Sequence, residues 1–229
     1  MRSRPGMNTW IGAAVAVLAL AASPALAATI TFDQLVDSGT LTYNGTGGPL
    51  VGTGITFQTI SPSLADPPPF NAGTDLVCGG CTLTFSTGAN VTEGPGVWTW
   101  ASGGTFTLTG TIPGIGIVVP SVILSGTFTE NPSATLVAGT LIFGGGGIDF
   151  KAPELVMFYF GLIAPPPPDN MIFMFSNTEI TATPTVGGNG SLSALVTEAD
   201  ITNRLPEPGS ALLLLLGLGS LAAYRRRRS

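Results

Sequence analysis

The sequence predicts an all-β domain of the antiparallel β-sandwich or jelly-roll kind. Residues 105–112 alternate four threonines with apolar residues and glycine, which is typical of a strand with one buried face. Residues 81–87 repeat this alternation, and clusters of Gly, Asn and Pro separate many short runs of the same kind. Thr and Gly dominate the composition; branched Thr favours strands and Gly favours turns.

The first 27 residues have the order of a secretory signal peptide, which forms a short helix. An apolar run at 10–22 follows a basic start, and a small-x-small triplet comes next. We expect signal peptidase to cut before Ala28, after the triplet Ala25, Leu26 and Ala27. An uncut N-terminal anchor is the alternative, but the apolar run is short for a membrane span.

The strands of the exported part are expected where apolar and polar residues alternate. They are 30–32, 41–43, 54–60, 81–87, 97–100, 105–112, 122–129, 134–143, 171–181 and 191–196. Turns are expected at 44–49, 144–147 and 187–190. Residues 153–163 are apolar on all sides, so they form either a buried strand or one short helix; Val, Phe and Tyr favour the strand, which we predict.

The only two cysteines, Cys78 and Cys81, are separated by two glycines. Export places them in an oxidising compartment, where a local disulfide is the expected state. A thioredoxin-like redox pair uses the same spacing, but its first cysteine opens a helix, whereas Cys81 begins a predicted strand. Free or metal-binding thiols are the remaining alternative. A zinc site would need two further ligands, and the chain has no histidine.

Trp98 and Trp100 fall on one face of a predicted strand. If that face is open, the two indoles form a sugar-stacking platform. Packing in the core is the alternative, and we expect it more often of two neighbouring tryptophans.

Residues 205–229 have the order of a membrane-sorting segment. They comprise Pro206, Glu207 and Pro208, an uncharged Leu-rich stretch at 209–224, and the basic cluster Arg225, Arg226, Arg227 and Arg228. As a helix, the uncharged stretch would rise about 24 Å, slightly less than the roughly 30 Å hydrocarbon core of a bilayer. Four arginines at its end should stay on the cytoplasmic side, so a transmembrane helix is predicted.

The Pro-Glu-Pro, the Leu-rich helix and the terminal arginines together resemble the PEP-CTERM sorting signal of Gram-negative bacteria. The resemblance implies that an exosortase, a membrane-embedded cysteine protease, recognises this segment in the inner membrane and cleaves at or near the Pro-Glu-Pro. It also implies a destination at the cell surface or in the extracellular matrix, in association with extracellular polysaccharide and biofilm. A C-terminal anchor that is never cut is the alternative.

The predicted organisation is therefore a signal peptide (1–27), an exported Thr/Gly-rich β-domain (28–204) and a sorting signal (205–229). Between 28 and 208 thirteen acidic residues face only two basic ones, which gives a net charge of −11. Such a surface repels nucleic acid and lacks the Lys and Arg that phosphate contacts need. Nucleic-acid binding is excluded as a function.

The absence of histidine removes Ser-His-Asp and Cys-His catalysis. Carboxylates remain for a glycosidase (Glu93, Glu130, Asp149 and Glu154) or for calcium (Asp66, Asp75 and Asp169), without a distinguishing pattern around any of them. We therefore predict a non-catalytic surface or matrix protein with no cofactor and no metal. A carbohydrate-binding or adhesin module is the alternative function.

Overall fold

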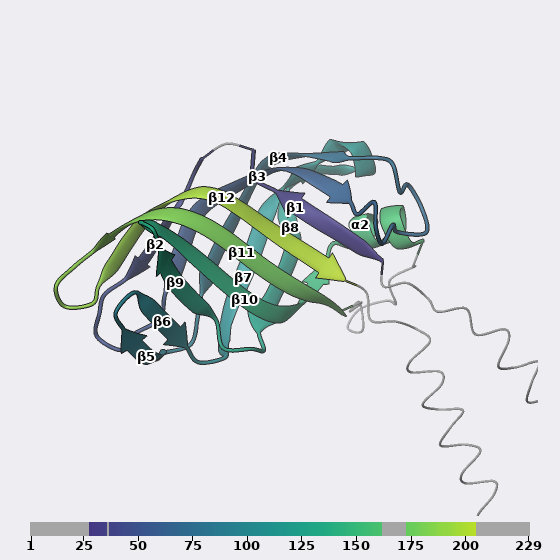
Figure 1. Cartoon of the computed structure of the whole chain (residues 1–229). Coiled ribbons are helices and arrows are strands. Elements are labelled where there is room, and N and C mark those ends of the chain that lie inside the picture. The colour runs from purple at the N-terminus through teal and green to yellow at the C-terminus, as the bar shows by residue number, and fades with distance from the viewer. Residues whose placement is uncertain (1–27, 36, 162–172, 205–229) are drawn as a thin grey trace, which may run out of the picture. The chain divides into compact units, whose positions relative to one another are not determined.

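The computed structural model describes residues 28–35, 37–161 and 173–204 (Figure 1). These described residues form one compact unit. Its strands are β1 (Thr29–Asp33), β2 (Thr40–Tyr43), β3 (Val51–Pro62), β4 (Leu76–Ser86), β5 (Asn90–Gly94), β6 (Val97–Trp100), β7 (Gly103–Ile112), β8 (Ile117–Phe128), β9 (Ser133–Val137), β10 (Thr140–Lys151), β11 (Phe173–Val186) and β12 (Leu192–Arg204). A 3-10 turn, η1 (Pro113–Ile115), and one α-helix, α2 (Pro153–Phe160), complete the described elements.

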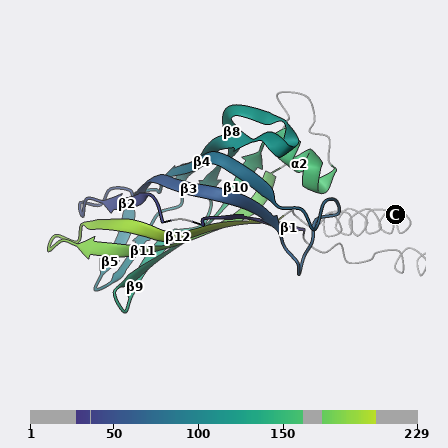
Figure 2. The same ribbon diagram turned by 90° about the horizontal axis from the view of Figure 1, so that it is seen from above.

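The strand pairings close into a ring, and every pairing is antiparallel. The ring runs through β3, β4, β7, β8, β10, β11 and β12, and β12 then pairs with both β1 and β2. β1 and β2 both pair with β3, so together they fill the last place in the ring. Figures 1 and 2 show the strands wrapping around a common interior. The expectation of an antiparallel all-β fold is confirmed.

A small side sheet leaves the ring at β10. β8 pairs with the second half of β10, from Gly147 to Lys151, and β9 pairs with the first half, from Thr140 to Gly144. β6 and then β5 continue outward from β9. All twelve strands belong to one connected sheet rather than two, so the sandwich or jelly-roll arrangement stays a prediction that the pairing does not confirm.

The period-two alternation of the sequence places apolar side chains inside the ring. In β7, Phe106, Leu108 and Ile112 are buried. The aromatic rings of β4, β8 and β10 meet in the interior, where Phe85 stacks on Phe143 with ring centroids 5.1 Å apart. Thr105, Thr107 and the other threonines of β7 take the opposite face, as the sequence predicts.

The glycine cluster at 144–147 is not a turn, and this prediction is wrong. It lies in the middle of β10, paired with Ser176 to Glu179 of β11. Packing requires a small residue there, because a Cβ at Gly145 would lie 2.8 Å from the Phe128 ring. The turn instead falls at Ala138 and Gly139, whose φ angles are 50° and 87°.

Other element boundaries also differ from prediction. The hairpin turn divides the expected 134–143 strand into β9 and the start of β10. β5 was not predicted at all: its residues are mostly exposed, so no alternation of buried and polar positions marks it.

Residues 153–160 form a helix, which corrects the predicted strand. Pro153 occupies the first turn with Glu154 beside it, and Gly161 ends the helix with a φ of 64°. The helix is apolar on several sides because Leu155, Val156, Tyr159 and Phe160 are all buried. It covers the end of the ring where β1 begins and β12 ends (Figure 1).

Tyr159 fastens α2 to the ring. Its hydroxyl lies 3.0 Å from the carbonyl oxygen of Ile60 and 2.8 Å from that of Thr74. Burial, together with the charge of Asp75, raises the pKa of this phenol. The hydroxyl therefore stays protonated and serves as a donor for these two buried carbonyls.

We predict that Tyr159→Phe lowers the free energy of unfolding by about 1–2 kcal/mol, because buried carbonyls lose a donor while the ring packing is kept. Urea unfolding at neutral pH measures the change. Asn71→Gly is the matched control. Asn71 donates its side-chain amide to the carbonyl of Phe158 in the same helix, at 2.7 Å but from an exposed position. Its loss should cost less, and an equal cost would contradict the role given to burial.

Candidate functional site

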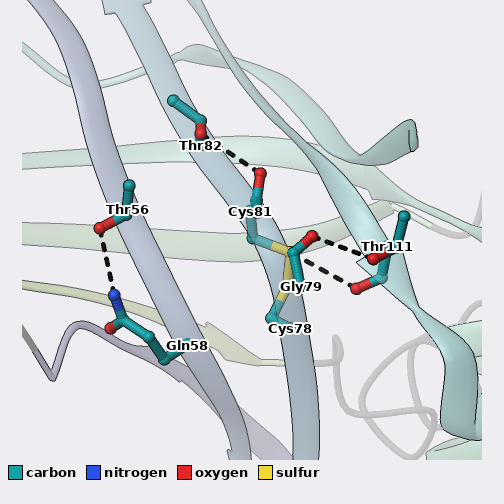
Figure 3. Close-up of a disulfide and its surroundings, with 8 residues drawn as sticks. Thr56, Gln58, Cys78, Gly79, Cys81, Thr82 and Thr111 are labelled. Carbon is teal, nitrogen blue, oxygen red and sulfur yellow. Dashed lines mark hydrogen bonds between the residues drawn. A yellow bond between two sulfur atoms is a disulfide. The ribbon is translucent and has the colours of Figure 1, made fainter. Parts of the chain in front are cut away.

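Cys78 and Cys81 bracket a bulge in β4. Their Cα atoms are 5.6 Å apart and the sulfurs are joined (Figure 3). Against β7 the register of β4 shifts between Gly79 and Thr82, where Gly80 and Cys81 lie opposite the single residue Gly110, so β4 contains one extra residue there. The Thr111 hydroxyl donates to the carbonyl of Gly79 at 3.0 Å and holds the bulge against β7.

Both cysteines are buried within a strand. Neither opens a helix, which is the position that a thioredoxin-like site uses. The pair therefore has the structural features of the predicted local disulfide.

Trp98 and Trp100 are buried, with 2% and 0% of their surfaces exposed. Trp100 packs edge-on against Tyr43 and also contacts Phe143, so it joins the side sheet to the ring. The Trp98 indole donates to the carbonyl of Gly190 at 3.3 Å. Neither ring offers an open face, which removes the observation that a sugar-stacking platform at these residues would need.

Inside the ring lies a group of polar side chains that we call the interior polar cluster: Asp149, Lys151, Ser176 and Asn203. Lys151 Nζ donates to Asp149 Oδ1 and, at 2.7 Å, to Asn203 Oδ1. The Asn203 amide nitrogen donates to the carbonyl of Ile201 at 3.1 Å. Asp149 and Asn203 are both 0% exposed.

Three strands supply the cluster. Asp149 and Lys151 lie two residues apart on the inward face of β10, in the same alternation as Leu141 and Phe143. Asn203 of β12 pairs with Ser176 of β11, which lies between the two other strands.

The neighbours of the cluster are apolar or small. Leu124 lies opposite Lys151 and Ile30 lies opposite Asn203. Gly126 lies opposite Asp149 and leaves room for it, because a Cβ there would come within 2.8 Å of the Asp149 Cβ. The cluster is therefore bordered mainly by apolar or small residues, with Thr178 as one further buried polar residue of β11.

Burial favours the uncharged forms of the pair. It raises the pKa of Asp149 above its usual range, although Lys151 and then Ser176 oppose the rise. It lowers the pKa of Lys151, although Asp149 opposes the fall. Desolvation is the larger cause for both groups, because neither side chain reaches solvent.

One carboxylate oxygen remains unpartnered in this cluster. Asp149 Oδ2 and Ser176 Oγ have no hydrogen-bond partner among the described residues, although the hydroxyl is close enough to affect the pKa of the carboxyl. A buried polar atom without a hydrogen bond lowers the stability of the folded protein, so these two oxygens call for an explanation. In the sequence, Asp149 is only one of several scattered acids, and Lys151 is only one of the two basic residues between 28 and 208.

A row of carboxylates crosses the outside of the ring. Asp33 of β1 lies directly opposite Asp200 of β12, and Asp200 lies opposite Glu179 of β11. Partial burial, and then the charges of Asp33, Glu198 and Glu179, raise the pKa of Asp200. Like charges placed directly across strands destabilise a sheet.

The other acids considered for catalysis are dispersed: Glu93 on β5, Glu130 after β8 and Glu154 on α2. Of the acids considered for calcium, Asp66 and Asp75 lie between β3 and β4, and Asp169 lies outside the described residues. Within residues 28–35, 37–161 and 173–204, no three His, Cys, Asp or Glu side chains are grouped to hold a metal ion.

Comparison with known families identifies the C-terminal segment. Residues 205–228 match the family described as the PEP-CTERM protein-sorting motif. The chain carries a PEP-CTERM sorting signal. The match confirms the resemblance seen in the Pro-Glu-Pro, the Leu-rich stretch and the arginines. It implies an exported protein that is processed by an exosortase-type system. No curated protein and no solved structure matches the chain.

The processing segments themselves lie outside the described residues. This applies to the signal peptide with Ala25 and Ala27, to Pro206, Glu207 and Pro208, to the predicted transmembrane helix at 209–224, and to Arg225–Arg228. Ala28, the predicted first residue after cleavage, is described and is buried. Among the described helices none is long and apolar enough to cross a membrane.

We predict that Asp200→Asn stabilises the domain at neutral pH by up to about 1 kcal/mol, because it removes the charge at the centre of the acidic row. A raised pKa means that the folded domain holds this proton more tightly than the unfolded chain does. Stability should therefore rise as the pH falls from neutral toward that pKa, and the rise should be smaller in the variant.

Thermal unfolding across this pH range is the measurement. Asp37→Asn, which changes an exposed carboxylate outside the row, serves as the control and should leave the pH dependence unchanged. Equal pH profiles for Asp200→Asn and the unaltered protein would refute the coupling.

Proposed function

We propose that the protein is a non-catalytic component of the cell surface or extracellular matrix of a Gram-negative bacterium, sorted by an exosortase and associated with extracellular polysaccharide. The match of residues 205–228 to the PEP-CTERM sorting motif carries this proposal. In this order of events, signal peptidase removes 1–27, the tail inserts transiently in the inner membrane, and the exosortase cuts at or near Pro206–Pro208.

The charge and surface of the β-domain support a role outside the cell. Removal of the tail takes away four of the eight basic residues and leaves a strongly acidic protein. Acidic proteins repel one another and stay soluble at high concentration. Threonine hydroxyls along the outer strand faces offer hydrogen bonds to hydrated polymer without requiring one defined pocket.

The proposed absence of catalysis rests on the side chains that the domain provides. It has no histidine, and the acid most shielded from solvent, Asp149, lies in the interior where a large substrate cannot reach it. The dispersed acids on β5, after β8 and on α2 offer no constellation that we can assign to hydrolysis.

A carbohydrate-binding or adhesin module is the second candidate, and it is weaker than the sequence alone suggested. Exposure of Trp98 and Trp100 would have been its best support, and both are buried. Exposed apolar residues occur instead on β8, at Val118, Val119 and Val122. Branched aliphatic side chains lack the flat aromatic face on which sugars stack.

The sorting step is tested on the full chain in a host with and without its exosortase-type protease. Mass spectrometry of the mature protein should show the loss of residues after the Pro206–Pro208 region only when the protease is present. Replacement of Pro206, Glu207 and Pro208 by alanine should keep the chain intact and in the membrane fraction. Secreted protein that still carries Arg225–Arg228 would refute the proposal.

Association with polysaccharide needs a separate measurement. We predict that the processed protein sediments with isolated extracellular polymer and is released when the polysaccharide is degraded enzymatically. The alanine variant of the sorting motif is the matched control, because its β-domain is unchanged while its release is blocked. Processed protein that stays soluble beside intact polymer would remove the matrix role but leave the sorting step standing.

A further inference from the structure

Three members of the interior polar cluster have the composition and contacts of a reactive site. Lys151 brings a primary amine, Asn203 a carboxamide, and Asp149 a carboxyl group that contacts the same amine. The amine lies 2.7 Å from the carbonyl oxygen of the carboxamide. A nucleophile held against a carbonyl group in a fixed orientation gains a large effective concentration.

The surroundings also suit attack by the amine. A protonated lysine is not a nucleophile, but burial lowers the pKa of Lys151 and so favours the free amine. Burial likewise favours the protonated form of Asp149, which can then give and take a proton at this point. The side chains of Asp149 and Lys151 have no exposed surface, so bulk water does not compete for the carbonyl carbon.

We propose that Lys151 and Asn203 become joined by an intramolecular isopeptide bond, with Asp149 as the proton-transfer residue. Lys151 Nζ attacks Asn203 Cγ while the Asp149 carboxyl protonates Oδ1. Asp149 then accepts a proton from Nζ and passes it to the amide nitrogen Nδ2, and ammonia leaves as the carbonyl re-forms and the Oδ1 proton returns to Asp149. One Nζ–Cγ bond forms, one Cγ–Nδ2 bond breaks, and Asp149 ends in its starting state. No oxidant or other reactant is required.

The bond would lock the ring at a mechanically significant place. It joins β10 to β12 across β11, which lies between them. Asn203 is also two residues before the sorting signal begins. A force applied to the C-terminal side of the domain would be carried by this covalent link, so β12 would not separate from its neighbouring strands.

Trypsin digestion can test for this bond, because Lys151 is the only lysine of the chain and no arginine lies between Arg4 and Arg204. Trypsin therefore cuts the β-domain internally only after Lys151. The full chain is exported, collected, reduced, unfolded in urea and digested. A free Lys151 gives two large fragments on a denaturing gel. An isopeptide-linked Lys151 is not a trypsin substrate, so the domain stays in one piece, and its intact mass is lower by one ammonia molecule.

Three variants identify the chemistry. Asp149→Asn keeps both reacting groups but cannot relay the proton, so it should be split into two fragments at full mass. Lys151→Arg keeps the trypsin site without a suitable nucleophile and should also be split. Asn177→Ala is the matched control: it alters an exposed amide on β11, and it should remain uncut and linked.

The result on the unaltered protein is decisive even if a variant fails to fold. Two tryptic fragments and an unshifted mass from natively folded protein would overturn the proposal and leave the cluster as an ordinary buried ion pair. An uncut domain in Asp149→Asn at full mass would show that protection from trypsin is not covalent. A linked Asp149→Asn domain that has lost ammonia would overturn the role of Asp149 alone.

Discussion

The pairing of β12 with strands on both of its sides is the constraint on which the rest of the structure depends. β12 hydrogen-bonds to β11 on one side and to β1 and β2 on the other, and this closes the ring. Once the ring is closed, each strand has an inner and an outer face, and the period-two alternation decides which side chains are enclosed. Closure also leaves the ring strands with few free edges, so unpaired backbone groups are concentrated in the side sheet and at the first half of β8.

Much of this fold could be predicted from local sequence, because half-buried strands carry their own signature. Residues 105–112 and 81–87 alternate Thr with apolar residues, and both lie in strands of the ring. The errors occur where a residue type has two physical uses. Glycine permits a turn, but it also makes room: at Gly145 it accommodates the Phe128 ring inside a strand, while the real turn uses Gly139. Local composition does not distinguish these uses, since the second depends on a residue from another strand.

The interior polar cluster likewise depends on residues from more than one strand. With 144–147 taken as a turn, the predicted alternation stops before Asp149. In the structure it continues along β10, so Asp149 and Lys151 lie on the same inward face as Leu141 and Phe143. Asn203 then adds a contact from a residue 52 positions away, which no local pattern indicates. The buried tryptophans are the converse case. Spacing placed Trp98 and Trp100 on one face correctly, but whether that face is covered depends on Tyr43, Phe143 and the 187–190 turn.

Closure of the ring links the fold to the route of export. Thr29 pairs with Arg204, so the first and last described strands must meet before the sheet is complete. Contacts between residues so far apart in the sequence form late, because closing a long loop costs conformational entropy before strand pairing can stabilise the structure. A chain that crosses the membrane from its N-terminus therefore cannot finish folding until β12 has also crossed. The PEP-CTERM motif begins at residue 205, directly after β12. The strand that completes the ring therefore directly precedes the sorting motif, and under the proposed cleavage at or near Pro206–Pro208 the ring closes with a strand that ends next to the cut.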